Sequence, residues 1–469
     1  MKIEITFLGA ARNVTGSCYL VQTPKANIVV DCGMYQEYKF KSRNWKEFPI
    51  PPNSIDAVLL THAHLDHCGL LPKLVKDGFK GDIFCTPATA EIAGIIMADS
   101  AHIQEEDIKF KKKRHEREGR TGPFPYEPLY TQEDVMATIP LIRQVAYNQE
   151  IPIADGIHAF FNEVGHIFGS SFIQVIVKDQ DDCRALLFSG DIGRDNLPIQ
   201  RDPEQPEEAD YVIMESTYGD RIHEEPASIP DELERVINST YKAGGNIVIP
   251  AFAVERTQEI LYFLGQLRKE KRIPPIVTFV DSPMAIRVIE VFRRHPELFD
   301  SETREMIANG GRPTDFPNLH LTRSVDESKE INNIRGTAII IAGSGMCTGG
   351  RIKHHLLANI SREESTILFV GYQAEGTLGR LILDQEHDEV RILGRTVPVR
   401  AKIERIGGFS AHADRNELIQ WVTALEENPK KVFITHGEES VAMSFADHLE
   451  EKTGWSTIVP EYGQTITLD

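Results

Sequence analysis

A dense cluster of potential metal ligands lies near the amino terminus of this 469-residue chain. Residues 61–67 read Thr-His-Ala-His-Leu-Asp-His, so His62, His64, Asp66 and His67 supply three imidazoles and a carboxylate within six residues. Imidazole nitrogen and carboxylate oxygen suit Zn²⁺, with Mn²⁺ or Fe²⁺ as chemically reasonable substitutes. The alternative is a solvated helix N-terminus that Asp66 only caps. The density of ligands favours the metal site.

The cluster lies between two apolar segments of different periodicity. Residues 55–60 form a short apolar run typical of a buried strand, whereas Leu70, Leu71, Leu74 and Val75 recur at helical spacing. The ligands therefore lie on a strand-to-helix turn. Packing holds strand ends rigidly and the loops beyond them are open to solvent, so a substrate can reach a metal held there.

Three further polar residues end strand-like runs, and each has a glycine beside it that lets the backbone turn sharply. They are His166, Asp191 and His436. Taken singly, a strand-end Asp is typical of a turn, and a strand-end His is commonly satisfied by hydrogen bonds. Two metals need more ligands than residues 61–67 provide, and these three residues are the candidates to complete the site.

Length and composition describe an ordinary globular protein of two domains. The sequence has no apolar run long enough to span a bilayer, and residues 2–7 alternate like a strand and unlike a signal peptide. We therefore expect a cytoplasmic protein, or a nuclear one where the cell has a nucleus. The six cysteines lack paired spacing, which fits reduced thiols, and Cys68 beside the cluster is expected to pack under the helix start.

The formal net charge of -19 repels polyanions at long range, so binding of nucleic acid would require a local concentration of basic residues. One such concentration lies in the polar segment 99–133, which we expect to be a mostly helical excursion from a sheet. It carries Lys109, Lys111, Lys112, Lys113, Arg114, Arg117 and Arg120. Charge of this kind is more often a solvated face, and a nucleic-acid role is the alternative.

The pattern of the chain changes after Gly219. Before it the chain is strand-rich, whereas beyond it helices expected at 230–242, 255–269, 284–294 and 351–359 alternate with strands expected at 246–249, 276–280, 338–341 and 366–370. This alternation predicts a parallel, doubly wound sheet. After about residue 396 the chain returns to isolated strands plus one helix. If His436 completes the metal site, residues 1–219 and 396–469 form one domain and residues 220–395 are inserted into it.

Taken in order, these motifs resemble a known superfamily. The His62-x-His64-x-Asp66-His67 stretch, with Gly165-His166, Ser189-Gly190-Asp191 and Thr435-His436-Gly437, resembles the metallo-β-lactamase fold, an αββα sandwich that holds two metals at one edge of its paired sheets. Glu215-Ser216-Thr217-Tyr218-Gly219 and Ser410-Ala411-His412-Ala413-Asp414 are similar to motifs of the β-CASP nucleases. The resemblance is to the endonuclease subunit of the pre-mRNA cleavage and polyadenylation machinery and its prokaryotic relatives. It implies an α/β protein, a metallo-β-lactamase αββα sandwich with an inserted parallel-sheet α/β (β-CASP) domain.

The resemblance also implies residue roles. Of two Zn²⁺ ions, one would be held by His62, His64 and His166, the other by Asp66, His67 and His436, and Asp191 would bridge them. Asp31 would orient a ligating imidazole. Asp66 would orient the attacking water, His412 would be the general acid, and Glu215 would hold its ring.

The implied activity is hydrolysis of phosphodiester bonds in single-stranded RNA during RNA processing or decay. An endonuclease is favoured, and a 5′-to-3′ exonuclease is the alternative mode. Candidate RNA phosphate contacts in the inserted domain are Arg256, Ser344, Lys353 and Arg380. No membrane partner is expected, and a homodimer stays open.

Three other functions compete with the nuclease. A metallo-hydrolase of the same fold that acts on thioesters, lactones or β-lactams would not need an insertion of this size. A non-catalytic RNA-processing scaffold would be marked by loss of ligands, yet all seven expected ligands are present. The diiron oxidoreductases of the fold typically have Glu where this chain has His64, which argues against that branch.

Overall fold

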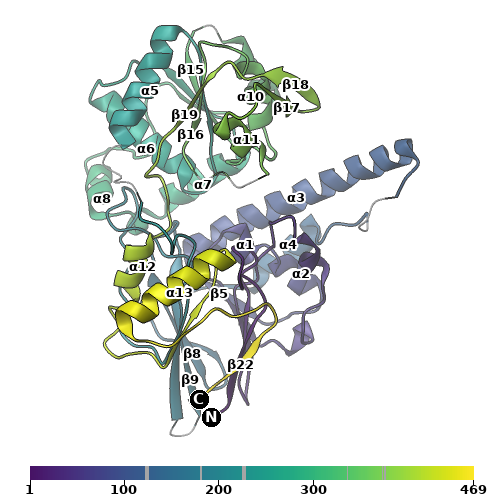
Figure 1. Ribbon diagram of the computed structural model, residues 1–469, viewed down its shortest axis with the longest axis vertical. Coiled ribbons are helices and arrows are strands. Elements are labelled where there is room, and N and C mark those ends of the chain that lie inside the picture. The colour runs from purple at the N-terminus through teal and green to yellow at the C-terminus, as the bar shows by residue number, and fades with distance from the viewer. Residues whose placement is uncertain (122–125, 180–181, 224–228, 335, 372, 374–375) are drawn as a thin grey trace. The chain divides into compact units, whose positions relative to one another are not determined.

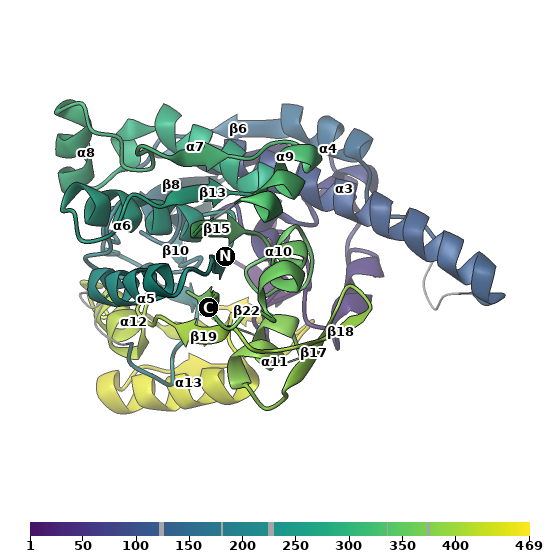
Figure 2. The ribbon, with the colours of Figure 1, turned by 90° about the horizontal axis from the view of Figure 1, so that it is seen from above.

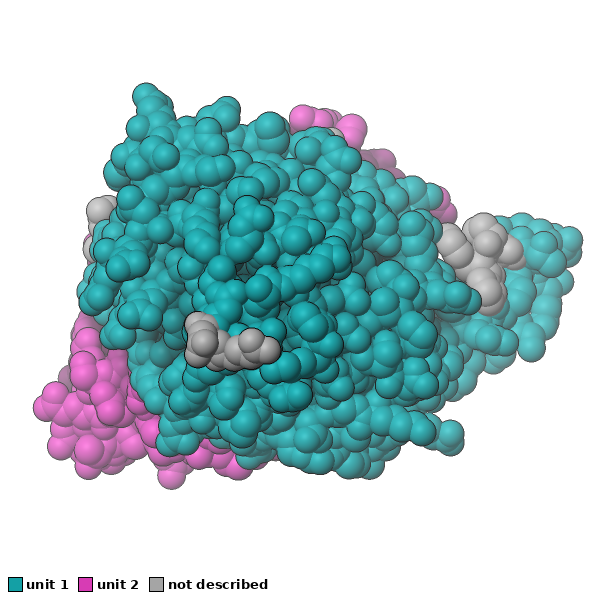
Figure 3. Space-filling model, turned by 90° about the horizontal axis from the view of Figure 1, so that it is seen from below, with its two compact units in different colours: residues 1–196, 202–222, 412–469 teal, residues 197–201, 223–411 magenta. Residues whose placement is uncertain are grey.

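The computed structural model describes residues 1–121, 126–179, 182–223, 229–334, 336–371, 373 and 376–469. Two compact units, coloured separately in Figure 3, make up the chain. Unit 1 comprises Met1–Asn196, Asp202–Ile222 and His412–Asp469, and unit 2 comprises Leu197–Arg201 and His223–Ala411. Unit 1 therefore contains both ends of the chain. The domain bounds 1–219, 220–395 and 396–469 stay a prediction, and unit 2 runs on to Ala411 because a strand at Lys402–Arg405 pairs within its sheet.

Two seven-stranded sheets form the centre of unit 1 (Figure 1). The first sheet has the order β22-β1-β2-β3-β4-β5-β6 and the second has the order β21-β20-β11-β10-β9-β8-β7. Strands of the first are β1 Ile3–Phe7, β2 Tyr19–Gln22, β3 Asn27–Val30, β4 Ala57–Leu59, β5 Asp82–Cys85, β6 Ile142–Gln144 and β22 Thr465–Leu468. Strands of the second are β7 Ile151–Ala154, β8 Ile157–Glu163, β9 Ser171–Asp179, β10 Asp182–Phe188, β11 Tyr211–Met214, β20 Lys431–Ile434 and β21 Thr457–Ile458.

Helices cover the outer faces of both sheets, and β10 shows how its sequence produces this arrangement. Leu186 and Phe188 join the core between the sheets, whereas Leu187 between them packs into a second core under the helices α12 (Arg415–Val422) and α13 (Glu439–Thr453). This alternation is the two-residue period of a strand buried on both faces. On the first sheet lie α1 (Leu65–Cys68), α2 (Leu71–Lys76), α3 (Pro87–Glu118) and α4 (Gln132–Thr138). The predicted αββα sandwich is confirmed.

The strands that precede the candidate ligands run in the same direction within each sheet, so their carboxyl ends lie together. In the first sheet β3, β4 and β5 are parallel. In the second, β10, β11 and β20 are parallel, and β8 runs in the same direction because β8 and β10 are both antiparallel to β9. Polar residues that follow these strands in sequence are therefore neighbours in space.

Unit 2 contains a six-stranded sheet in the order β14-β13-β15-β12-β16-β19, and every neighbouring pair is parallel. The strands are β12 Ile247–Pro250, β13 Val277–Val280, β14 Leu319–Leu321, β15 Ala338–Ala342, β16 Thr366–Phe369 and β19 Lys402–Arg405. The helices are α5 Ile229–Ala243, α6 Arg256–Lys269, α7 Pro283–Arg294, α8 Ser301–Ala308, α9 Val325–Glu330, α10 Ile352–Asn359 and α11 Leu378–Asp384, several of which Figure 2 shows around the sheet. The expected parallel sheet is confirmed. The hairpin of β17 (Glu389–Ile392) and β18 (Arg395–Pro398) was not expected.

Other segments differ from expectation. The expectation of one helix after residue 396 is wrong, because this part of the chain forms two helices, α12 and α13. The short helix α12 begins after Asp414, whose carboxylate accepts from the backbone N–H groups of Asn416 and Glu417. Helix α3 begins earlier than the expected segment 99–133, after the cap residue Thr86. β9 and β10 pair antiparallel, and residues 180 and 181 between them lie outside the described residues.

Among the helices that the structure describes, none combines the length and the apolar character needed to cross a membrane.

Candidate metal centre

The histidine-rich turn leaves β4 and enters α1, and the loop after β3 presses against it. A Cβ on Gly33 would lie 1.6 Å from the carbonyl oxygen of Asp66, so only glycine permits this approach. Gly190 has φ +56°, and a Cβ there would lie 2.9 Å from Cβ of Thr61. These two glycines allow the loops after β3 and β10 to bring Asp31 and Asp191 to the turn.

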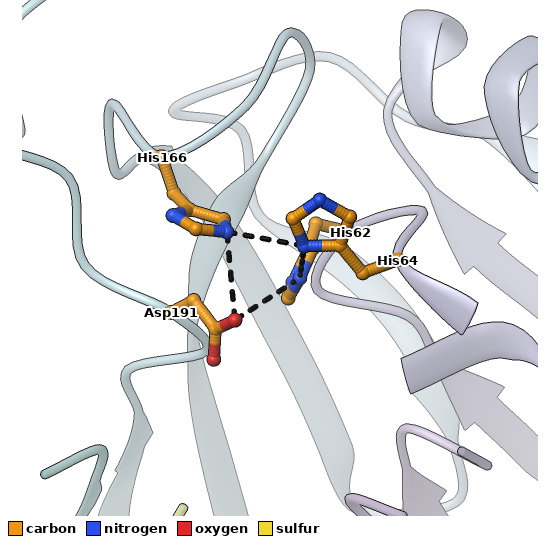
Figure 4. A group of neighbouring side chains, drawn as sticks. All are labelled: His62, His64, His166 and Asp191. Atoms are coloured by element: carbon orange, nitrogen blue, oxygen red, sulfur yellow. Dashed lines mark hydrogen bonds and ion pairs between the residues drawn. The ribbon is translucent and has the colours of Figure 1, made fainter. Parts of the chain in front are cut away.

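One group of ligand atoms consists of His62, His64, His166 and Asp191 (Figure 4). Nδ1 of His64 lies 3.1 Å from Nε2 of His62 and 3.2 Å from Nε2 of His166. His62 and His166 are buried. The three imidazole nitrogens converge on one point, so a cation there would have three nitrogen ligands.

A second group consists of Asp66, His67 and His436. Nε2 of His67 lies 3.1 Å from Nε2 of His436, which lies 3.6 Å from Oδ2 of Asp66. His67 and His436 are buried, whereas the Asp66 side chain is 17% exposed. The second group therefore has an open side at Asp66.

Asp191 lies between the two groups. Its Oδ2 is 3.4 Å from Nε2 of His62 and 3.5 Å from Nε2 of His166. Its Oδ1 is 3.3 Å from Nε2 of His67 and 3.4 Å from Nε2 of His436. Although the residue is 2% exposed, Oδ1 makes no hydrogen bond to the described residues. A buried carboxylate oxygen in this state requires a partner, and a cation in each group would supply one to each oxygen.

Hydrogen bonds made by Nδ1, on the far side of the ring from the other ligand atoms, orient three of the imidazoles. The Asp31 carboxylate accepts from Nδ1 of His67 at 2.8 Å and from the backbone N–H of Thr61 at 2.8 Å. Because the Thr61 hydroxyl donates to Asp31, it accepts from Nδ1 of His62 at 3.0 Å. The Thr217 hydroxyl donates to the His436 carbonyl and accepts from Nδ1 of that ring at 3.0 Å. In each case the hydrogen bond is made by Nδ1, and Nε2 is left to face the site.

Asp31 was expected to orient a ligating imidazole, whereas the contacts of Thr61 and Thr217 were not expected. The available signal was position, since Thr61 precedes His62 and Thr217 lies within the Glu215 motif.

His412 and Glu215 form a pair beside the two groups. Nδ1 of His412 lies 3.1 Å from Oε1 and 3.2 Å from Oε2 of Glu215, whose Oε1 also accepts from the backbone N–H of Ile192 at 2.6 Å. Nε2 of His412 lies 4.0 Å from Oδ2 of Asp191, and its side chain is 21% exposed. Asp191, Glu215 and His412 themselves form a third group that could hold a metal ion. The more open position of His412 suits contact with a substrate.

Burial and neighbouring charges set the protonation of these residues. Burial lowers the pKa of His62 to about 3 and that of His64 to about 4, so both imidazoles are neutral near pH 7. Burial opposes charge on His412 too, but the Glu215 carboxylate outweighs it and raises the pKa of His412 to about 9. Burial likewise opposes charge on His67 and His436, yet Asp191 raises the pKa of both rings. Bound divalent cations would replace the protons of those two rings.

The donor set fits divalent metal ions. It combines neutral imidazoles with carboxylates, which suits Zn²⁺, Mn²⁺ or Fe²⁺. Cys68 is no member of the three groups found among the described residues. Its thiol donates to the Ala63 carbonyl at 3.3 Å, and burial raises the pKa of the thiol, so Cys68 is a buried packing residue at the end of α1.

The four candidate RNA contacts lie in unit 2 and differ in availability. The Arg256 guanidinium is buried, pairs with Glu259 and lies over the Phe409 ring. Ser344 is hydrogen-bonded within its own loop to Gly349. Lys353 is half-buried on α10, and Nε of Arg380 lies 2.7 Å from Asp384. Their role stays a prediction.

Comparison with known proteins agrees with this architecture. Residues 11–211 match the metallo-beta-lactamase superfamily, residues 257–382 match the Beta-Casp domain, and residues 396–460 match the Zn-dependent metallo-hydrolase RNA specificity domain. A protein of unknown function from Enterococcus faecalis V583 has the same fold, with a TM-score of 0.53 over 100% of both chains and 13% sequence identity.

Relatives match over nearly the entire chain. A ribonuclease from Thermus thermophilus is 36% identical over 99% of this chain and 100% of its own length. The transcription termination factor FttA from Methanocaldococcus jannaschii is 31% identical over 98% of this chain and 70% of its own length. These matches support a metal-dependent hydrolase and confirm the resemblance drawn from the motifs. The chain belongs to the β-CASP nuclease family of the metallo-β-lactamase superfamily.

Proposed function

We propose that this protein is a dinuclear zinc-dependent ribonuclease that hydrolyses phosphodiester bonds of single-stranded RNA in the cytoplasm. The position of Asp191 carries the proposal, because each of its carboxylate oxygens faces a different group of ligand atoms. RNA as the substrate is supported by the matched RNA specificity domain and by the relative that is named a ribonuclease.

In this proposal His62, His64 and His166 hold one Zn²⁺, and Asp66, His67 and His436 hold the other. Asp191 lies between them as the shared ligand. When bound, two such ions lower the pKa of water and neutralise negative charge on a phosphodiester.

The remaining residues move and hold protons. Asp66 is partly exposed and accepts a hydrogen bond from the attacking water, which it thereby orients. His412 carries a proton on Nε2 and donates it to the leaving oxygen, while Glu215 accepts from Nδ1 and keeps the ring in that tautomer and orientation. The pKa of His412, raised to about 9, keeps this proton in place near neutral pH.

In unit 2, Ser344, Lys353 and Arg380 are the candidates to contact RNA phosphates. Arg256 could do so only by leaving its buried pair with Glu259, which would cost about 3–5 kcal/mol. Arg256 is therefore the weakest of the four candidates.

Cleavage of end-labelled RNA tests the proposal. Zinc-loaded protein is incubated with single-stranded RNA labelled at either end, alongside DNA of the same sequence and the Asp66→Ala variant. We expect zinc-dependent cleavage of RNA that Asp66→Ala abolishes. Internal fragments that appear first indicate an endonuclease, which we favour, and mononucleotides that appear first indicate an exonuclease. Absence of metal-dependent cleavage of RNA would refute the proposal.

A further inference from the structure

Helix α3 begins beside the metal centre. The hydroxyls of Thr86 and Thr89 both donate to the carbonyl of Gly169, at 2.6 and 2.7 Å, and Gly169 lies in the loop that carries His166. From there the 32-residue helix runs away from the sheets of unit 1, as Figures 1 and 2 show from two directions. We refer to residues 103–118 as the α3 arm.

The returning chain covers one face of α3. The Tyr126 hydroxyl lies 2.7 Å from Nδ1 of His115, Gln104 accepts from the backbone N–H of Leu129, and the Tyr130 hydroxyl donates to Ser100. At about 100° per residue, Ser100, Gln104 and His115 lie on the same side of the helix. Among the described residues, these three contacts all lie on this side of the helix, and Lys109, Lys113 and Arg117 lie on the opposite side.

The opposite side combines exposed apolar and basic side chains. Ile103 is 54% exposed and Phe110 is 66% exposed, and a spacing of seven residues places them on one face. Lys109, Lys113 and Arg117 follow one another at four-residue spacing along the same side, about 6 Å apart, and all three are exposed. A merely solvated face would not need a large aromatic residue among its cations.

The cations of the arm are concentrated in its outer part. Residues 103–118 contain six Lys and Arg and five Asp and Glu, whereas residues 109–120 contain seven Lys and Arg and two Glu, in a chain with a formal net charge of -19. Lys109 pairs with Glu106 at 2.9 Å, whereas Lys113 and Arg117 form no ion pair with a described residue. Exposed pairs such as Lys109–Glu106 contribute little and yield to a stronger anion. A polyanion is therefore the partner that fits this surface.

We propose that this face of the α3 arm, formed by Ile103, Lys109, Phe110, Lys113 and Arg117, binds single-stranded RNA away from the metal centre. The inference rests on the proposed ribonuclease function. The cations contact successive phosphates and Phe110 stacks on a base, a combination that binds single strands without reading sequence. From Thr89 to Lys109, the nearest cation of the face, the helix rises about 30 Å, so a stacked strand of about nine nucleotides is the shortest that reaches from the centre to these cations.

The test compares two triple variants. Lys109→Ala/Lys113→Ala/Arg117→Ala removes the three cations of the proposed face, leaves Lys111, Lys112 and Arg114 in place, and keeps the helix propensity of the arm. The matched control, Lys2→Ala/Lys25→Ala/Lys178→Ala, removes three exposed, ion-paired cations from unit 1 far from the arm, around the turns after β2 and β9. Binding of a 30-nucleotide single-stranded RNA to the zinc-loaded proteins is followed by fluorescence anisotropy at several salt concentrations. Cleavage of the 30-nucleotide RNA and of a six-nucleotide RNA is measured in parallel.

We expect the arm variant to raise Kd and KM for the 30-nucleotide RNA on the order of tenfold at low salt and to leave kcat unchanged. The slope of log Kd against log salt should fall by about 2, and cleavage of the six-nucleotide RNA should stay as in wild type. Phe110→Ala should also weaken binding, but without changing the slope. The control variant should bind as wild type does.

Three results would overturn the proposal. They are an unchanged Kd in the arm variant, an equal loss in the control, and a change of sedimentation coefficient that shows the arm to be a contact between two copies of the chain. Circular dichroism checks that the helix is retained. If wild type cleaves neither RNA, the proposed function fails, and the anisotropy comparison still decides on the arm.

Discussion

Asp191 differs from the other candidate ligands because both of its carboxylate oxygens face imidazole nitrogen, each within a different group. The other carboxylate, Asp66, lies beside His436 in one group only. Residue types were enough to predict the seven candidate ligands, because carboxylate and imidazole are concentrated in residues 62–67 and because strand ends are fixed by packing, whereas the division into two groups came from the resemblance to the metallo-β-lactamase fold. The positions of Thr61 and Thr217 within their motifs could be noted from the sequence, but their contacts could not be predicted, because these depend on side-chain rotamers and on loops distant in sequence.

Replacement of His412 separates proton transfer from metal binding. His412→Ala should lower kcat about 10²–10⁴-fold, because the leaving oxygen loses its proton donor, and zinc content should not change. Single-turnover cleavage and mass-spectrometric metal analysis measure the two quantities. Loss of zinc would show instead that His412, with Asp191 and Glu215, is a metal ligand. Cleavage at the wild-type rate would remove His412 from the mechanism.

Oδ2 of Asp31 lies 2.8 Å from Nδ1 of His67, so we expect Asp31 to act by orienting that ring. Asp31→Asn should lower zinc affinity about 10–100-fold while leaving the ligands themselves in place. Competition with a chromogenic zinc chelator gives the affinity. Excess zinc should restore cleavage if the defect is in affinity alone, and a defect that zinc does not restore would contradict this role.

At the scale of elements, periodic helices and apolar strands were predictable, whereas short strands with polar residues were not. The helices α5, α6, α7 and α10 and the strands between them lie within one or two residues of their expected bounds. Strands β14 and β19, with the sequences Leu-His-Leu and Lys-Ile-Glu-Arg, lack a continuous apolar run, and they exist because a neighbouring strand offers an edge. The parallel sheet itself followed from alternation, since parallel strands need crossover helices.

An ion-pair cluster holds several elements of unit 2 together. Asp281, which follows β13, accepts from Arg351 and His355 at 2.6 Å each and from Ser328 of α9 at 2.5 Å. Asp281→Asn should therefore destabilise unit 2 by about 3 kcal/mol at pH 7, because Arg351 and the buried His355 lose the carboxylate that accepts a hydrogen bond from each. The urea midpoint of the unit 2 transition measures this loss. The control is Asp326→Asn in α9, the helix that carries Ser328. Because the Asp326 side chain is 92% exposed, this variant should leave the midpoint unchanged.

The stability lost in Asp281→Asn should also depend on pH, and it should be smaller in acid. Burial raises the pKa of Asp281, but His355, Ser328 and Arg351 outweigh it and hold the pKa below its ordinary value. A depressed carboxyl pKa stabilises the fold above the unfolded pKa of about 3.9, and this stabilisation is lost as the pH falls through the folded pKa. The difference between wild type and Asp281→Asn should thus be constant from about pH 5 to 7 and shrink below about pH 4. An equal difference at pH 3 would contradict the ion-pair account.

At the scale of the whole molecule, each unit has its own hydrophobic core, and all seven candidate metal ligands lie in unit 1. Removal of metal should therefore lower the unfolding temperature of unit 1 alone. A ligand at a thousandfold excess over its Kd stabilises by about 4 kcal/mol, which corresponds to roughly 10 °C for a unit of this size. Scanning calorimetry with and without a chelator measures both transitions. Equal shifts of the two transitions, or a shift that persists in Asp191→Ala, would contradict this assignment.

Zinc titration of metal-free protein tests the dinuclear site most directly. Bound zinc and the initial rate of single-stranded RNA cleavage are measured in the same samples as zinc is added. The arrangement around Asp191 predicts about two zinc ions per chain, with cleavage rising as the second ion binds. Full cleavage at one zinc ion per chain, or two bound ions without cleavage of RNA, would contradict it.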